Sequence, residues 1–283
     1  MKVLIIGASG QLGAAVVHEF SPHSDVIALR RRDLDITDDA RVLARVTAEV
    51  PDVIVNCAAY NLVDAAEDDP VTALNVNAFG VRALARAAGE NGATLVQYST
   101  DFVFDGRTDR PYAEPDRPNP QGVYAVSKLL GEWFAADAPR YYVLRVESLF
   151  GHAPGGPDRG SATMIRQQLI AGDEVPVFVD RTVSPTSVFD AAAATRALVD
   201  RKLPFGLYHC VNAGRCTWWE FAEEAARLLG VQPRLKSITL DSVPFRAARP
   251  KYCALSTEKL ASLGVTLPGW RDGLRRWLAP AAR

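Results

Sequence analysis

Short apolar runs alternate with amphipathic stretches through the first half of the chain. The apolar runs, which predict strands, fall at residues 2–6, 26–29, 53–56, 94–98 and 142–145. Between them, apolar positions at helical spacing predict helices at about 11–20, 38–49, 70–91 and 124–135. Strands that are apolar on both faces and alternate with helices form parallel sheets with helices on each side. The pattern therefore predicts an α/β fold with a doubly wound parallel sheet.

The sequence changes character after Gly151, where the next residues read His-Ala-Pro-Gly-Gly-Pro and predict a loop. Beyond it, helices are predicted at about 163–171, 217–229, 256–263 and 270–278. We expect residues 1–150 to form one domain, to which part of 175–212 returns. Residues 151–283 then form mainly a smaller C-terminal lobe.

A glycine-rich turn joins the first predicted strand to the first predicted helix. It reads Gly7-Ala8-Ser9-Gly10-Gln11-Leu12-Gly13. Glycine permits a tight turn and a close approach of backbone to phosphate, and the free N–H groups of a helix start attract anions. The turn predicts a dinucleotide site in a Rossmann-like domain. The alternative is a purely structural turn, because the spacing is G-x-x-G-x-x-G rather than G-x-G-x-x-G.

Basic residues follow the second predicted strand, at Arg30-Arg31-Arg32. An enzyme that prefers NADH usually carries an acid here, which holds the ribose 2′-hydroxyl. Arginine instead offers donors to a 2′-phosphate. The arginines predict NADPH as the cofactor, with NADH as a second cofactor that the site tolerates. A solvated basic turn is the alternative.

Charge and composition exclude several classes of partner. The 283 residues carry a formal net charge of −1 with charges evenly scattered, so no nucleic acid or membrane partner is expected. The chain has no apolar run of membrane-spanning length and no signal-peptide core, and we expect a cytoplasmic protein. Its four cysteines and four histidines form no metal-ligand motif, so no metal is expected. The sequence leaves open whether the protein forms a homodimer.

Candidate catalytic side chains follow the fourth predicted strand. Thr100 stands at its end beside Ser99, and Tyr124 and Lys128 share one face of the next helix. An adjacent ammonium is expected to lower the pKa of the Tyr124 phenol, which would then act as general acid. Thr100, with Ser99, would hydrogen-bond the substrate oxygen. The alternative is a half-buried aromatic residue beside a solvated lysine.

These features resemble the extended short-chain dehydrogenase/reductase superfamily and, within it, the dTDP-4-dehydrorhamnose reductase family. The most family-specific run is Tyr-Ser-Thr-Asp-Phe-Val-Phe-Asp-Gly at 98–106. The other matching segments are at 7–13, 33–37, 56–60, 63–67, 76–78, 120–124, 127–129 and 131–132. The resemblance covers nearly the whole chain.

The resemblance implies roles for individual residues. It implies catalysis by Thr100, Tyr124 and Lys128. It implies cofactor binding by Gly7, Ser9, Gly10, Gln11, Leu12, Gly13, Arg30, Arg31, Asp35, Ile36, Ala58, Ala59, Tyr60, Asn77, Ser99, Tyr124 and Lys128. It implies substrate binding by Asp101, Phe102, Val103, Ser148, Arg181, Thr186 and Arg249. With Arg246 or Lys251, Arg249 would clamp a diphosphate, and a solvated basic loop is the alternative reading of these cations.

The chain departs from the family pattern on the substrate side. Glu147-Ser148 stands where many members carry Ser-Trp, and Arg181 stands where glutamine is usual. Ala248 replaces a common arginine, and Ala15 replaces a glutamate that some members link to magnesium at a dimer interface. The identity of the sugar and a metal-bridged dimer are therefore open.

The family resemblance implies NADPH-dependent reduction of the C4 keto group of a dTDP-4-keto-6-deoxyhexose, a nucleotide sugar. The product would be dTDP-L-rhamnose or a close relative. One alternative is a reductase of a GDP- or UDP-linked keto sugar. Another is a non-catalytic NADP-binding regulatory subunit that resembles the beta subunit of methionine adenosyltransferase.

Overall fold

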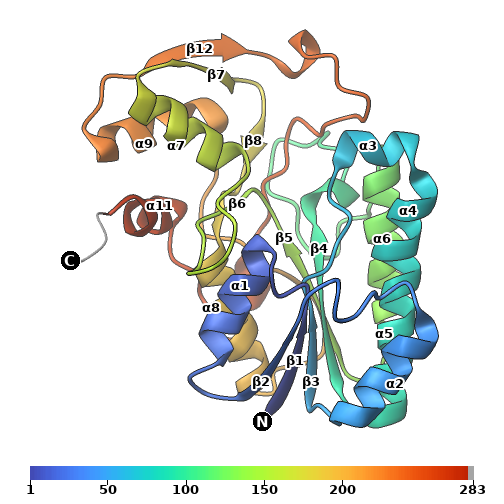
Figure 1. Ribbon diagram of the computed structural model, residues 1–283. Helices are drawn as coiled ribbons and strands as arrows, with labels where there is room; N and C mark the ends of the chain where they lie inside the picture. The colour runs from blue at the N-terminus through green and yellow to red at the C-terminus, as the bar shows by residue number, and fades with distance from the viewer. Residues whose placement is uncertain (280–283) are drawn as a thin grey trace.

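A parallel sheet of six strands forms the centre of the computed structural model, which describes residues 1–279 (Figure 1). The strands lie in the order β10-β5-β4-β3-β1-β2, and every neighbouring pair is parallel. Their bounds are β1 (Lys2–Ile6), β2 (Asp25–Leu29), β3 (Val53–Asn56), β4 (Thr94–Thr100), β5 (Tyr141–Val146) and β10 (Gly206–His209). The predicted doubly wound α/β fold is confirmed.

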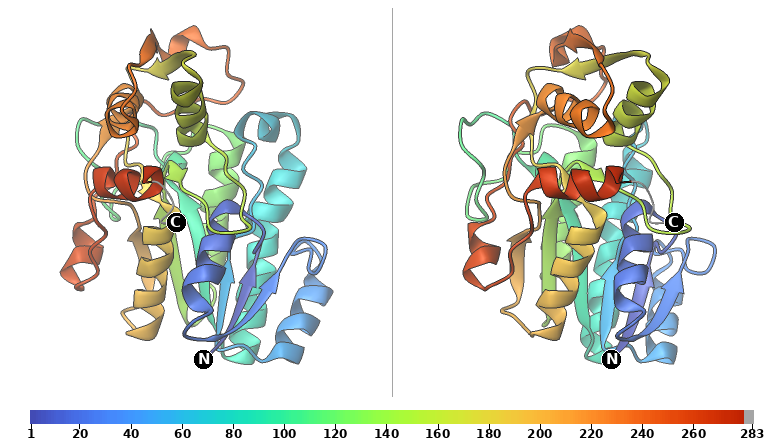
Figure 2. Two further views of the ribbon diagram at one scale, coloured as in Figure 1. Left: turned by 60° about the vertical axis from the view of Figure 1, so that its left-hand side comes forward. Right: turned by 90° about the vertical axis from the view of Figure 1, so that its left-hand side faces the viewer.

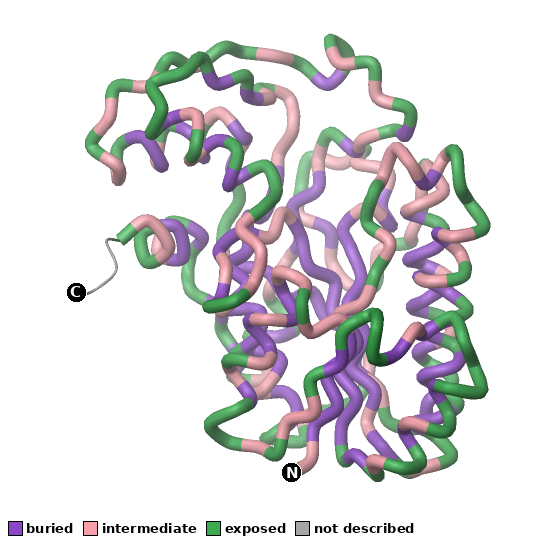
Figure 3. The backbone as a smooth tube through the Cα atoms, in the orientation of Figure 1, coloured by how far each residue is buried: buried purple, intermediate pink, exposed green. Residues whose placement is uncertain are grey.

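Helices cover both faces of this sheet (Figure 1). One face carries α1 (Gln11–Phe20) and α8 (Val188–Asp200), and the other carries α2 (Asp39–Glu49), α5 (Gly80–Asn91) and α6 (Val123–Ala135). Alternate side chains of β1 enter the two cores, with Val3 and Ile5 on the α1 side and Leu4 and Ile6 on the other. Burial on both faces explains the uninterrupted apolar runs. Figure 3 shows the buried strands at the centre of the molecule.

Some helices differ from those that the sequence pattern predicts. The stretch 70–91 is divided into α4 (Pro70–Leu74), a π-helical turn (Asn75–Phe79) and α5. The short helix α3 (Val63–Asp68), α8 and the edge strand β10 were not predicted at all. In α8, most residues are buried against α1 and the sheet, so its alanine-rich sequence shows little amphipathic contrast. Both α8 and β10 lie within residues 175–212 of the chain.

The C-terminal lobe lies over the carboxyl ends of the strands, as both views in Figure 2 show. It contains α7 (Ser161–Ala171), α9 (Trp218–Leu229) and α11 (Trp270–Leu278) around the parallel pair β7 (Glu174–Phe178) and β12 (Arg234–Ile238). Its remaining elements are β6 (Leu149–Phe150), β8 (Thr182–Val183), β9 (Thr186–Ser187), β11 (Cys216–Thr217) and α10 (Glu258–Ser262). The lobe has its own apolar core, which includes Phe221 and Trp270. Within residues 1–279, no helix is long and apolar enough to cross a membrane.

Candidate active site

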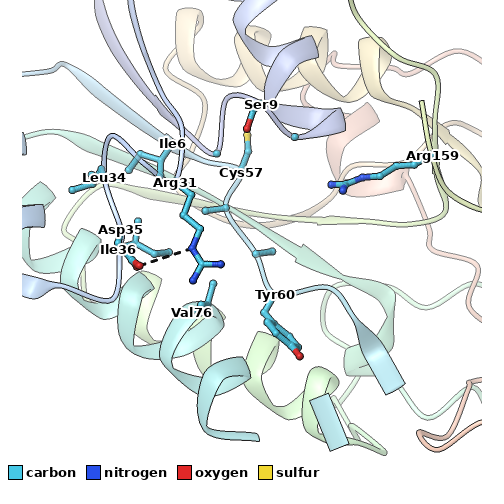
Figure 4. Close-up of a pocket in the computed structure, with 14 residues that line it drawn as sticks. Ile6, Ser9, Arg31, Leu34, Asp35, Ile36, Cys57, Tyr60, Val76 and Arg159 are labelled. Atoms are coloured by element: carbon cyan, nitrogen blue, oxygen red, sulfur yellow. Dashed lines mark ion pairs between the residues drawn. The ribbon is translucent and has the colours of Figure 1, made fainter. Parts of the chain in front are cut away.

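A cavity of about 200 Å³ opens where β1 and β3 end, beside the glycine-rich turn (Figure 4). Gly7 has a φ of +74°, and a Cβ there would lie 2.6 Å from the Ala58 nitrogen. A Cβ at Gly13 would lie 2.2 Å from the Gly7 carbonyl oxygen. Both positions therefore require glycine, because the turn, β3 and α1 pack too closely for any side chain.

The start of α1 offers unpaired donors to this cavity. Ser9 and Gly10 line the cavity, and within residues 1–279 no side chain caps the helix at Gly10. The first N–H groups of an α-helix have no partner inside the helix, and the helix dipole favours an anion there. A dinucleotide pyrophosphate fits this donor set.

The predicted cofactor residues fall into two groups. Those that line the cavity are Gly7, Ser9, Gly10, Arg31, Asp35, Ile36, Ala58, Ala59 and Tyr60. The cavity lining does not include Gln11, Leu12, Gly13, Arg30, Asn77, Ser99, Tyr124 or Lys128. Asn77 hydrogen-bonds the backbone N–H and carbonyl of Tyr60, and Ser99 donates to Glu132. These two buried side chains support the cavity walls from behind.

The three predicted catalytic residues come together at the carboxyl end of β4. Thr100 ends that strand, Tyr124 stands in the first turn of α6, and Lys128 follows one turn later. Burial raises the pKa of Tyr124 to about 12, although a hydrogen bond with Thr100 lowers it and the charge of Asp101 raises it further. The Tyr124 ring packs edge-on against Phe102, with ring centres 5.6 Å apart.

Lys128 is hydrogen-bonded to the backbone of β4 in this structure. Its Nζ donates a 2.6 Å hydrogen bond to the Tyr98 carbonyl, and burial lowers its pKa to about 8 while Glu132 raises it. Our expectation that its ammonium lowers the pKa of Tyr124 is wrong for this structure, because the burial of the phenol dominates. Gln97 also donates to the Tyr98 carbonyl, at 2.6 Å. The backbone of β4 thus holds the Lys128 ammonium in place.

A buried ion pair joins α6 to β5. The Arg145 guanidinium, on β5, makes two hydrogen bonds to the Glu132 carboxylate, at 2.8 and 2.7 Å. Ser99 donates to the same carboxylate at 2.5 Å, and Arg145 also lies over the Phe104 ring. Sequence analysis missed this network, because its members are far apart along the chain and no local spacing connects them.

A second buried charged cluster lies next to Thr100 and contains two of the departures from the family pattern. Arg181 is 4.0 Å from the Asp101 carboxylate and donates to the Cys253 sulfur at 3.8 Å. Glu147 accepts a 2.8 Å hydrogen bond from the Ser184 N–H. Single ligand atoms of Asp101, Glu147 and Cys253 lie within 4.8 Å of one another. The Arg181 guanidinium beside them supplies a positive charge, which disfavours a metal cation at this point.

Both carboxyl groups of this cluster lose solvation. Burial raises the pKa of Glu147 well above its usual range, and the nearby Asp101 raises it further. Burial also raises the pKa of Asp101, against the lowering effect of Arg181. One oxygen of each group, Asp101 Oδ2 and Glu147 Oε1, is buried without a hydrogen-bond partner within residues 1–279. Two buried acids beside a single guanidinium favour the protonated form of one of them.

Replacing Glu147 by glutamine is expected to stabilise the fold by roughly 1 kcal/mol near pH 8, because a neutral amide is buried at a lower cost than a carboxylate. The folded-state pKa of Glu147 lies above the unfolded value, so the folded chain binds the extra proton and its stability falls as pH rises between the two values. The stability gain of the glutamine variant over the parent chain should therefore shrink as the pH is lowered toward about 5. Urea denaturation of both proteins across this range measures it.

The exposed Glu90 provides the matched control, and Glu90→Gln should change stability little at any pH. A Glu147→Gln variant with the same pH dependence of unfolding as the parent chain would contradict the raised pKa of Glu147.

The remaining predicted substrate residues differ in their exposure. Val103 and Thr186 are fully buried, and Thr186 donates to the Ser184 carbonyl, whereas Phe102 lines a small cavity with Tyr124. Ser148, where family members place an aromatic residue, has a φ of +45°.

Arg249 is already paired with an acid. Its guanidinium donates to Asp64 of α3 at 2.7 Å and lies over the Phe245 ring. Arg246 pairs with Asp68 of the same helix, and Lys251 pairs with Asp241 and Asp180. Arg249, with a side chain 11% exposed, is thus a largely buried ion-pair partner of α3, whereas Arg246 and Lys251 are paired but more than half exposed.

Comparisons with known proteins agree with this geometry. The model of the family described as RmlD substrate binding domain matches residues 1–283. A dTDP-4-dehydrorhamnose reductase of Streptomyces griseus is 39% identical over 290 residues, which span 98% of this chain and 90% of that protein. A corresponding enzyme of Mycobacterium tuberculosis is 37% identical over 99% of this chain and 93% of its own length.

Solved structures of dTDP-4-dehydrorhamnose reductases are also similar to this chain. A dTDP-4-dehydrorhamnose reductase of Clostridium acetobutylicum matches with a TM-score of 0.92 and 35% identity, over 98% of each chain. The enzyme of Bacillus anthracis, solved in complex with NADP, matches with a TM-score of 0.92 and 33% identity, also over 98% of each chain. A Thermus thermophilus UDP-glucose 4-epimerase in complex with NAD, at 21% identity and a TM-score of 0.81, shares the fold.

Proposed function

The chain belongs to the RmlD substrate binding domain family, and from that premise we propose that it is an NADPH-dependent reductase of dTDP-4-dehydrorhamnose. Hydride from the cofactor would reach the C4 keto group of the sugar and give dTDP-L-rhamnose. The observation that carries this proposal is the meeting of Thr100, Tyr124 and Lys128 at the same end of the sheet as the glycine-rich cavity.

The cavity supports NADPH as the hydride donor. The N–H groups at the start of α1 would hold the pyrophosphate, and Asp35 and Ile36 would lie along the adenine and ribose. Arg31 lines the same cavity and would bind a 2′-phosphate, whereas Arg30 does not line it. The relative from Bacillus anthracis was solved with NADP, which supports the same cofactor here.

The protein groups would handle the proton. Because burial keeps the pKa of Tyr124 near 12, its phenol stays protonated at neutral pH and is available to donate to the alkoxide oxygen that forms at C4. Thr100 would hydrogen-bond the same oxygen and stabilise its negative charge. Lys128, on the same face of α6 as Tyr124, would bind the nicotinamide ribose.

The two lobes would bind different ligands. We place the cofactor on residues 1–150 together with α8 and β10, which complete the sheet, and the nucleotide sugar on the C-terminal lobe. Arg181 and Arg249 both lie over the Phe102 ring, next to Tyr124, and are the cations nearest to the reacting centre on the substrate side. Arg249 would exchange Asp64 for a diphosphate oxygen of the substrate.

A different nucleotide-linked keto sugar is the second candidate substrate. The buried pair Glu147 and Arg181 favours it, because these charges replace neutral residues of the family pattern beside Thr100. The third reading, a regulatory subunit without catalysis, would not need Thr100, Tyr124 and Lys128 together at a cofactor cavity.

The test is NADPH consumption with dTDP-4-dehydrorhamnose generated in place by the upstream enzymes, followed by chromatography of the nucleotide sugar. We expect stoichiometric loss of NADPH and formation of dTDP-L-rhamnose. Turnover with a GDP- or UDP-linked keto sugar alone would select the second candidate. Tight NADPH binding without turnover of any keto sugar would favour the regulatory reading.

A further inference from the structure

A glycine- and proline-rich loop of the C-terminal lobe, residues 151–160, passes beside the cofactor cavity. Its backbone is tied to the start of α1, because Gln11 Nε2 donates to the Gly151 carbonyl at 2.8 Å and to the Arg159 carbonyl at 3.2 Å. Gln11 belongs to the glycine-rich turn itself. The loop is therefore fastened to the element that would face a pyrophosphate.

The other end of the loop is fastened to α7. Thr163 donates to the Asp158 carboxylate at 2.7 Å and also to the Arg159 carbonyl at 3.2 Å. Arg166 pairs with the same carboxylate and packs over the Trp277 ring. The backbone at Arg159 is thus held from both lobes, while the side chain of Arg159 takes no part in these contacts.

The Arg159 guanidinium points into the cavity. Figure 4 shows it entering from the side opposite Leu34 and Ile36, and it shares the cavity lining with Ser9, Gly10 and Arg31. None of the ion pairs among residues 1–279 includes Arg159. Because Arg159 is exposed and outside these ion pairs, its guanidinium can pair with an anion bound between it and the positive end of α1.

We infer that Arg159 is a cofactor ligand supplied by the C-terminal lobe, and that it binds the pyrophosphate of the dinucleotide. The inference rests on the proposed NADPH-binding function. It assigns two separate tasks to the two arginines of the cavity, with the pyrophosphate at Arg159 and the 2′-phosphate at Arg31. Because loop 151–160 leads directly into α7, cofactor binding would also fix the position of the substrate lobe.

The assignments of Arg159 and Arg31 predict that their alanine variants differ in how they affect NADPH and NADH binding. Since NADPH and NADH share the pyrophosphate, Arg159→Ala is expected to raise the Kd of both by roughly tenfold, the effect of one charge-assisted hydrogen bond. Arg31→Ala should raise the Kd of NADPH by a similar factor and leave that of NADH nearly unchanged. Isothermal titration calorimetry on the purified full chain measures all four constants without any turnover.

Arg32→Ala is the matched control, because this exposed arginine lies near the cavity without lining it. It should change neither Kd by more than about twofold. Arg159→Lys, which keeps the charge, should recover part of the lost affinity. The exposed position of Arg159 allows substitution without loss of the fold, which an unchanged melting temperature would verify.

The binding measurements distinguish failure of the Arg159 assignment from failure of the proposed function. If the parent chain binds neither cofactor, the proposed function fails. If the parent chain binds NADPH and Arg159→Ala binds both cofactors equally well, only the Arg159 assignment is overturned. It is also overturned if Arg159→Ala weakens NADPH alone, since the guanidinium would then serve the 2′-phosphate.

Discussion

Replacing Tyr124 by phenylalanine is expected to lower kcat by roughly 10²–10⁴-fold, the usual contribution of a positioned general acid. The substitution removes only the hydroxyl, and the ring keeps its edge-on contact with Phe102. The Kd of NADPH should stay within about threefold of the parent value, because the cavity lining does not include Tyr124. Steady-state kinetics with the keto sugar and a direct cofactor titration measure the two quantities.

Tyr141→Phe is the matched control, since Tyr141 stands at the amino end of β5, far from the carboxyl ends where the cavity opens. That variant should retain the parent kcat. A Tyr124→Phe enzyme with full activity would show that a different group protonates the sugar oxygen, and the assignment of Tyr124 as general acid would be wrong.

The sequence predicts β1 to β5 of the sheet because each of these strands carries its own local signal, whereas the edge strand β10 was missed. Val3-Leu4-Ile5-Ile6 and Val53-Ile54-Val55 are apolar at every position, and both faces of these strands are buried as expected. Helix α1 falls at the predicted residues 11–20. Helix α8 was missed because its alanines are buried on more than one side, so that its sequence lacks a clear polar face.

The positions of some site residues could be predicted from the sequence, but their electrostatic state could not. The spacing of Tyr124 and Lys128 on one helix face follows from helix geometry, so their proximity could be predicted. The electrostatic state of these groups could not, because it depends on burial and on the Tyr98 carbonyl contributed by another element. Arg159 was missed for the same reason, since only the folded loop brings it to the turn that contains Gln11.

Two of the departures from the family pattern, Glu147 and Arg181, lie in one cluster. Taken singly, a glutamate at 147 would bury an uncompensated charge, and an arginine at 181 would do the same with the opposite sign. Together they lie in one buried cluster with Asp101, where Arg181 offsets part of the negative charge. We therefore interpret the pair as a joint change of the substrate pocket next to Thr100.

Replacing Arg145 by methionine is expected to lower the free energy of unfolding by about 3–5 kcal/mol, because it leaves the Glu132 carboxylate buried without its ion-pair partner. Both side chains are less than a tenth exposed, so water cannot replace the lost hydrogen bonds without opening the core. His209 is not expected to take over as the cation, because burial is the largest cause of its pKa being lowered to about 3, and that burial remains when Arg145 is removed. Urea denaturation monitored by circular dichroism measures the loss.

The double variant Arg145→Met with Glu132→Leu separates pairing from packing. If the loss in the single variant comes from the unpaired carboxylate, removal of that carboxylate should restore most of the stability, as apolar replacements of buried ion pairs often do. The restored protein should still be a poorer enzyme, because Ser99 and Lys128 would lose the negative charge behind them. A double variant as unstable as the single one would show that the shape of Arg145, packed over Phe104, matters more than its charge.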